Sequence, residues 1–264
     1  MSEARIYIGT SGWTYDDWSG TFYPPDVQGA DRLNYYARHF DAVEVNATFY
    51  RLPYPSMITA WNRRLPPGFH LVVKGSRAVT HLRKLSGCEK ELHLFLDRVL
   101  LLQRLEVILW QIPPSLRKDL PRLEAFLAAL PKKVRHAVEF RHETWWCEET
   151  ARLLSRHGAA FVAVSHPRLP HTIFPTADFI YVRFHGLGRR LYVYDYSRRE
   201  LEEWAERLRP HLEGRTLYAF FNNDYHANAP RNALTFRDIL GVPAPRVAER
   251  KPDGEGRPGK VTNR

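Results

Sequence analysis

Acidic, basic and imidazole side chains occur in short apolar segments of this 264-residue sequence. The segment VEFRHETWW, residues 138–146, has the alternation of a strand but carries Glu139, Arg141 and His142. A buried charge is costly unless it is paired, so these residues either neutralise one another or face a ligand. Carboxylates beside cations and imidazoles are suited to acid/base chemistry on an anionic substrate.

Three residues are candidates for catalysis. We expect Glu44 and Glu139 to form an acid/base pair, in which burial keeps one carboxyl protonated and an arginine keeps the other ionised. His185 is expected to transfer protons beside them. The residues predicted to bind the substrate are polar or aromatic, and they lie at strand ends or in the loops that follow. They are Trp13, Asn46, Lys74, Arg141, His142, Arg183, Asn222 and Asn223. The alternative is a layer of salt bridges in which the basic residues only neutralise the two glutamates.

Eight short apolar segments alternate with amphipathic helical patterns and must position these residues. The predicted strands are residues 5–9, 42–46, 70–74, 106–111, 136–140, 160–165, 179–185 and 217–222. The segment HPRLPHTIFPTA, with its three prolines, predicts an irregular unit between strands six and seven. Eight units predict an α/β fold of the TIM type, a (β/α)8 barrel formed by residues 1–243 as one domain. A doubly wound open sheet is the alternative, but no GxGxxG follows the first strand.

Strand alternation predicts where the charged residues point. Successive side chains alternate between the helices and the barrel interior, so Glu44, Glu139 and Arg183 face inward between apolar neighbours. His185 follows Arg183 by two residues and should face the same way. Lys74 should also face inward, because it alternates in step with the inward-facing apolar residues of its own strand. Four strands therefore send polar groups inward near their carboxyl ends, where barrel enzymes carry their active sites.

Net charge and loop composition indicate the kind of partner. The chain carries a net charge of +10 and has 31 arginines against eight lysines, which favours binding of phosphate or carboxylate groups. Aromatic and basic loops follow strands one, three and seven, as in TSGWTYDDWSGTFYPP and GLGRRLYVYDYS. We therefore expect an anionic small molecule or a nucleic acid as partner. Residues 244–264, rich in proline and mixed charges, predict a basic disordered tail.

Other classes of protein fit the sequence less well. The sequence lacks a long apolar run and a signal-peptide pattern, so we expect a cytoplasmic protein with no membrane partner. Cys88 and Cys147 lack the spacing of a zinc site and are predicted to be reduced thiols. No cofactor is predicted, since cationic residues among Glu44, Glu139 and His185 would repel a metal ion, although a catalytic divalent metal stays open as an alternative.

Six ordered motifs resemble the YecE-like family, known as domain of unknown function 72. They are GTSGW with a following FYP, VEVNATFYRLP, WQIPP, VEFRHETWW, YVRFHG, and FNND followed by NA. The resemblance implies a TIM-barrel-like fold similar to the endonuclease IV and xylose isomerase type, and it adds Gln111 of WQIPP to the expected pocket residues. It supplies no reaction.

Our leading hypothesis is an enzyme, a hydrolase or an isomerase, that acts on a sugar phosphate or a nucleic acid. The alternatives are a nucleic-acid-binding protein with repair-type phosphodiester hydrolysis and a catalytically inert interaction module.

Overall fold

The computed structural model describes residues 4–245 and shows an α/β fold built on two parallel sheets. The first sheet has the order β2-β3-β4-β5-β6, and the second has the order β1-β9-β8-β7. The strands of the first sheet are β2 (Ala42–Val45), β3 (His70–Lys74), β4 (Leu105–Ile112), β5 (Arg135–Phe140) and β6 (Ala160–Phe161). Those of the second sheet are β1 (Ile6–Thr10), β7 (Ala163–Ser165), β8 (Phe179–Phe184) and β9 (Thr216–Phe221).

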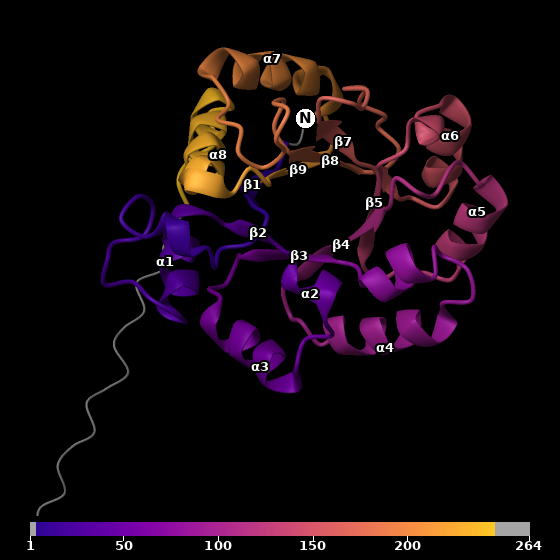
Figure 1. The fold of residues 1–264 in the computed structure, drawn as a ribbon, viewed down its shortest axis with the longest axis horizontal. Helices are drawn as coiled ribbons and strands as arrows, with labels where there is room; N and C mark the ends of the chain where they lie inside the picture. The colour runs from indigo at the N-terminus through magenta and orange to yellow at the C-terminus, as the bar shows by residue number, and fades with distance from the viewer. Residues whose placement is uncertain (1–3, 246–264) are drawn as a thin grey trace, which may run out of the picture.

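Helices lie outside the strands, and the elements follow one another around the molecule in chain order (Figure 1). The α-helices are α1 (Asp31–His39), α2 (Ala47–Tyr50), α3 (Pro55–Arg64), α4 (Glu89–Val99), α5 (Leu120–Ala128), α6 (Glu148–Arg156), α7 (Arg198–Leu208) and α8 (Asn228–Ile239). The first and last helices are neighbours, because Arg237 of α8 donates a hydrogen bond to the carbonyl oxygen of His39 in α1, at 2.6 Å.

Backbone contacts connect the two sheets at two places. Beyond the end of β1, Ser11 forms an isolated parallel bridge with Glu44 of β2, and the Gly12 amide donates to the Glu44 carbonyl oxygen at 2.8 Å. On the other side, only Val162 separates β6 of the first sheet from β7 of the second. The Val162 amide donates to the carbonyl oxygen of Val138 in β5 at 3.0 Å.

The apolar side chains of the strands fall into two packed clusters, which confirms the predicted alternation. Val43, Val138 and Val182 belong to a large outer cluster with the buried faces of the helices. An inner cluster contains residues of the opposite parity, including Val72 and Tyr181, and its fully packed members come from strands and from Val162. Charged residues that share this second parity must therefore lie on the inner side of the sheets.

The sequence predictions for individual elements agree closely with the structure. Each predicted strand overlaps an observed one, although the sixth is interrupted at Val162. The proline-rich segment, residues 166–177, contains no helix or strand, as predicted. Cys88 and Cys147 are free thiols. The predicted tail lies outside the described residues except for residues 244 and 245.

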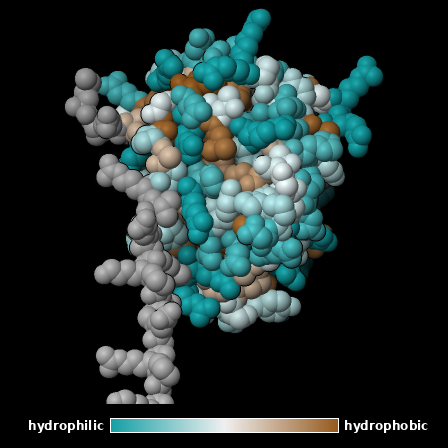
Figure 2. Space-filling model, turned by 90° about the vertical axis from the view of Figure 1, so that its left-hand side faces the viewer, coloured by the Kyte–Doolittle hydropathy of each residue, from teal (hydrophilic) through white to brown (hydrophobic). Residues whose placement is uncertain are grey.

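The surface that faces the viewer in Figure 2 is mainly hydrophilic, with hydrophobic residues in small separate patches. Among the helices of the described part of the chain, none is both long enough and apolar enough to span a membrane.

Candidate functional site

A buried ion-pair network joins the carboxyl ends of β2, β5 and β8. Arg183 lies between two glutamates, with Nη2 at 2.6 Å from Glu44 Oε1 and Nη1 at 2.5 Å from Glu139 Oε2. All three side chains are fully buried. Glu44 also accepts hydrogen bonds from the Ser11 hydroxyl at 2.7 Å and the Tyr181 hydroxyl at 2.6 Å. This is the salt-bridge arrangement that the sequence offered as one of two interpretations.

Glu139 continues the network toward the solvent. Its Oε1 pairs with Arg141 Nε, lies 3.2 Å from His185 Nε2 and accepts a hydrogen bond from Gln111 Nε2 at 3.3 Å. Burial alone would raise the pKa of Glu139, but Arg141 and then Arg183 hold it well below its usual value. Glu139 is therefore an ionised carboxylate near neutral pH, saturated with donors, and a weak base.

His185 is a neutral imidazole inside this network. Burial first, and Arg141 second, lower the pKa of His185 well below its usual value, so the ring is uncharged near neutral pH. Its Nε2 lies 3.0 Å from Arg141 Nη2, and its Nδ1 lies 3.1 Å from Asn222 Nδ2. These contacts, together with Glu139, fix the orientation of both the imidazole and the Arg141 guanidinium.

A pocket of about 580 Å³ opens beside the network at the carboxyl ends of β4, β5 and β7. Three predicted site residues, Gln111, Arg141 and His142, line it. The remaining lining residues, which the site predictions did not include, are His81, Pro114, Glu143, His166, Arg168, Leu169, Leu191 and Tyr192. Two arginines and three histidines against one glutamate make the pocket suitable for an anion.

Backbone amides orient two of the pocket histidines. The Thr144 amide donates to His142 Nδ1 at 3.2 Å, and the Arg168 amide donates to His166 Nδ1 at 3.2 Å. A nitrogen that accepts a hydrogen bond carries no proton, so each ring has its proton on Nε2. Burial first and Arg141 second lower the pKa of His166 to about 4, which keeps that ring neutral. Both histidines are therefore held as Nε2–H donors.

Lys74 ends β3 close to the network but is not part of it. Its side chain is 9% exposed, and its ammonium group lies 4.1 Å from the centre of the Phe49 ring in α2. Among the described residues, Lys74 Nζ has no hydrogen-bond or ion-pair partner. Burial first and Arg183 second lower the pKa of Lys74 to about 7.

The predicted site residues separate into groups. Trp13 and Asn46 lie in a second pocket, of about 480 Å³, where Trp13 packs edge-on against Trp61. Asn222 contacts His185 in the network, but Asn223 is fully buried and points elsewhere, donating to the Tyr194 carbonyl oxygen and to Asn232 Oδ1 at 2.7 Å each. A contact between substrate and any of these residues stays a prediction.

Strand parity contains the signal that would have located one of the missed residues, His166. His166 follows Val162 and Val164, both members of the inner cluster, by steps of two. Extending the alternation beyond the predicted strand would have placed His166 on the inner side. The same alternation places Asn222 on the inner side and Asn223 on the opposite side. Arg168 and Tyr192 lie in irregular loops, for which the sequence has no comparable periodic signal.

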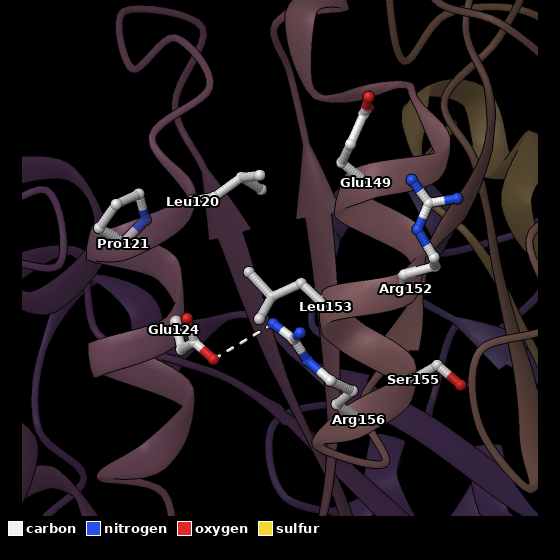
Figure 3. A pocket seen from close by; sticks show the side chains of 8 residues that line it. All are labelled: Leu120, Pro121, Glu124, Glu149, Arg152, Leu153, Ser155 and Arg156. Atoms are coloured by element: carbon white, nitrogen blue, oxygen red, sulfur yellow. Dashed lines mark hydrogen bonds and ion pairs between the residues drawn. The ribbon is translucent and has the colours of Figure 1, made fainter.

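One other hollow of the surface lacks this chemistry. Figure 3 shows this hollow, of about 580 Å³, between α5 and α6, where an exposed ion pair joins Arg156 and Glu124 at 3.2 Å. Exposed ion pairs of this kind are common on protein surfaces and contribute little. Within residues 4–245, no group of three or more His, Cys, Asp or Glu side chains is arranged to hold a metal ion.

Comparisons with known proteins place this parallel α/β protein, with its polar cluster at the strand ends, in a defined class. Residues 7–256 match the family described as "Protein of unknown function DUF72", and the chain belongs to this family. The resemblance found in the sequence motifs is thereby confirmed. The matched region extends into the segment predicted as a tail.

Relatives and solved structures span nearly the whole chain. The UPF0759 protein YunF of Bacillus subtilis is 24% identical and covers 94% of this chain and 99% of its own length. The UPF0759 protein YecE of Escherichia coli K12 is 26% identical, covering 92% of this chain and 95% of its own length.

Among solved structures, a DUF72 family protein from Thermotoga maritima is similar with a TM-score of 0.80 at 34% identity, covering 90% of this chain and 99% of that one. Another, from Enterococcus faecalis, has a TM-score of 0.77 at 19% identity and covers 94% and 100% of the two chains. The second likeness concerns the fold alone.

Proposed function

We propose that this protein is an enzyme that binds a phosphate-bearing or otherwise anionic small molecule in the pocket lined by Arg141 and Arg168. The observation that carries the proposal is the set of hydrogen-bond donors there. His142 and His166 are fixed with a proton on Nε2, next to two guanidinium groups. Such donors are preorganised for the oxygens of an anion, because their acceptor nitrogens are already occupied.

We also propose that the two sheets close into a single eight-stranded barrel, with the pocket at its carboxyl-terminal end. The bridge between Ser11 and Glu44 supports closure on one side. The direct passage from β6 through Val162 into β7 supports it on the other. The inner cluster of strand residues would then fill the barrel, and the network would form its uppermost layer.

The network and the pocket would have separate tasks. Glu44, Glu139 and Arg183 are fully buried and form ion pairs with one another, so we assign them to holding Arg141 and His185 in position. Proton transfer to or from the substrate would fall to neutral imidazoles, His185 among them. Of the imidazoles that line the pocket, His81 is suited to this task, and burial is the main reason that its pKa is lowered to about 4.

Arg168 provides the sharpest test, because it is exposed and makes no ion pair within the described residues. Titration calorimetry with inorganic phosphate and with small sugar phosphates should detect binding to the unaltered protein. Arg168→Gln should weaken binding by about tenfold or more, the loss of one charged hydrogen bond. Arg189→Gln is the matched control, because Arg189 is an exposed arginine in the loop after β8 but does not line the pocket. Equal affinity in Arg168→Gln and the unaltered protein would contradict the proposal.

A further inference from the structure

Among the residues that the structure describes, Lys74 is a largely buried cation of this region for which the network provides no partner. The carboxylates of Glu44 and Glu139 influence its pKa but are occupied by Arg183 and Arg141. Its side chain is nine-tenths buried and makes no hydrogen bond or ion pair among residues 4–245. A buried ammonium without a partner is unfavourable, whereas an unprotonated amine carries no such penalty.

Lys74 does not itself line the pocket, but two ring contacts connect its amine with a residue of the pocket wall. Phe49 contacts both Lys74 and His81, with the ammonium 4.1 Å and the imidazole centre 4.8 Å from the centre of the phenyl ring. His81 itself lines the pocket. The backbone of Lys74 is fixed as well, since its carbonyl oxygen accepts a hydrogen bond from the Thr48 hydroxyl at 2.7 Å.

The charged groups around Lys74 come from three other strands. Burial first, then Arg183 of β8, lowers its pKa, Glu139 and Glu44 oppose this, and Arg141 adds to the lowering. The balance leaves the pKa of Lys74 at about 7, so much of the population is the free amine near neutral pH.

Other nucleophiles near the network are engaged or distant. The Ser11 hydroxyl donates to Glu44 and is 1% exposed. Cys88 and Cys147 precede α4 and α6, on the helical layer. Proton transfer is already available from imidazoles, so a second weak base would add little. An unpaired amine adds what the pocket otherwise lacks, which is a group able to form a covalent bond with a carbonyl carbon.

We propose that Lys74 is the nucleophile of this site and forms an imine with an aldehyde or ketone that also carries a phosphate or carboxylate group. This inference rests on the proposed function, since Arg141 and Arg168 would hold the anionic group while the carbonyl carbon lies at Nζ.

The chemistry balances without another reactant. The lone pair of Nζ attacks the carbonyl carbon, a C–N bond forms, and the carbonyl oxygen takes up a proton as Nζ loses one, which gives a carbinolamine. The hydroxyl group then leaves as water with a second proton, which is taken up from the solvent, and the C=N bond is formed as a protonated imine. The neutral imidazole of His81, on the pocket wall, would accept the proton that Nζ loses and return it to the carbonyl oxygen.

Reductive trapping tests the inference on the full-length protein. The protein is incubated with glycolaldehyde phosphate and sodium cyanoborohydride at pH 7.5, and the reduced adducts are located by peptide mapping. Lys74 should be labelled about tenfold faster than the exposed Lys90, because a lowered pKa exposes the free amine at this pH. Uncharged glycolaldehyde should label Lys74 more slowly than the phosphate does. Equal labelling of Lys74 and Lys90 by both reagents would overturn the inference.

Phosphate binding, measured separately by calorimetry on unlabelled protein, distinguishes the two proposals. Phosphate binding without preferential labelling of Lys74 would refute the imine and leave the proposed function intact. If both aldehydes label Lys74 preferentially and at equal rates, and phosphate does not bind, the role of Lys74 as a nucleophile is retained and the anion site is refuted. Because labelling is read on the unaltered protein, the result does not depend on a variant that folds poorly. In Lys74→Arg, the adduct at this position should disappear.

Discussion

At the scale of single residues, Arg183 is the residue on which the buried charges depend. It is fully buried and binds both Glu44 and Glu139. Without it, two buried carboxylates would each lose a cation, and the penalty of an unpaired buried charge is large. The pair interaction itself adds little net stability, because forming it also removes three charged groups from water.

We therefore expect Arg183→Met to lower the free energy of unfolding by roughly 3–5 kcal/mol. Urea unfolding at neutral pH measures the change. Arg189→Met, at an exposed position, should change stability by no more than about 0.5 kcal/mol. Combining Arg183→Met with Glu44→Gln and Glu139→Gln should recover part of the loss, because no buried carboxylate is then left unpaired. A loss below about 1 kcal/mol would show that solvent reaches the glutamates.

Lys74 should make stability depend on pH in a defined direction. Its pKa in the folded protein is about 7, below the ordinary value of a lysine, so burial destabilises the charged form. Below pH 7 the residue is protonated in both states and the penalty is complete. Between the two pKa values only the unfolded chain holds the proton, so the penalty falls as pH rises and vanishes above about pH 10.4.

Lys74→Met should consequently raise the melting temperature more at pH 6 than at pH 9.5. An increase of roughly 5 °C at pH 6 is expected for a chain of this size. Differential scanning calorimetry at the two pH values measures the difference, and Lys90→Met, which alters an exposed lysine, is the control. The same effect of Lys74→Met at both pH values would contradict a lowered pKa.

At the scale of elements, the strands follow their sequence pattern and the loops between them do not. Val43, Glu44 and Val45 alternate as predicted, because each strand must bury one face against helices and the other inside. The partners of Glu44 were not predictable in this way, since the choice between neighbouring cations depends on side-chain reach and on the stagger of the strands. The sequence therefore indicated which charged residues face inward, but not which of them form ion pairs with one another.

The loop between β8 and α7 shows the same limit and carries local strain. Tyr192 has a φ of 72°, a left-handed conformation that is unfavourable for a bulky side chain. Its amide donates to the His185 carbonyl oxygen at 2.9 Å, and its own carbonyl oxygen accepts from the Tyr225 amide at 3.3 Å. These contacts hold Tyr192 in the wall of the pocket despite its unfavourable backbone.

Two substitutions of Tyr192 separate the effect of its backbone conformation on stability from the effect of its side chain. Tyr192→Ala removes the ring and keeps the strain, whereas Tyr192→Gly removes both. We expect the glycine variant to be more stable than the alanine variant by about 1 kcal/mol, as measured by urea unfolding. If the alanine variant were equally stable, the left-handed conformation would not cost free energy at this position.

At the scale of the whole molecule, the net charge of +10 allows two kinds of partner with different responses to salt. A nucleic acid contacts many basic residues at once, and each contact releases counterions. A small anion in a half-enclosed pocket meets only two arginines, Arg141 and Arg168. The salt dependence of binding therefore separates the two alternatives.

For a sugar phosphate we expect affinity to fall less than about tenfold between 50 and 200 mM salt, because few counterions are released. Calorimetry at the two salt concentrations gives the slope, and a short single-stranded oligonucleotide is the comparison ligand. Oligonucleotide binding that is tighter and falls by about a thousandfold over the same range would favour the nucleic-acid alternative.

The architecture was largely predictable from the whole chain, and the pocket was not. Eight apolar segments and a proline-rich interruption indicated the α/β fold, because a parallel sheet buries both faces of every strand. The pocket also depends on Arg168 and Tyr192, which irregular loops bring beside Arg141. Such loops have no period, so a sequence pattern alone does not place them.

The network also has a consequence for biosynthesis. Glu44 and Glu139 are both made before Arg183, which lies 139 residues after the first glutamate. Until β8 emerges from the ribosome, Glu44 lacks the arginine that neutralises it, and Glu139 has Arg141 but not Arg183. We expect the inner face of that incomplete sheet to stay hydrated, and the final close packing of the interior to wait for the last third of the chain.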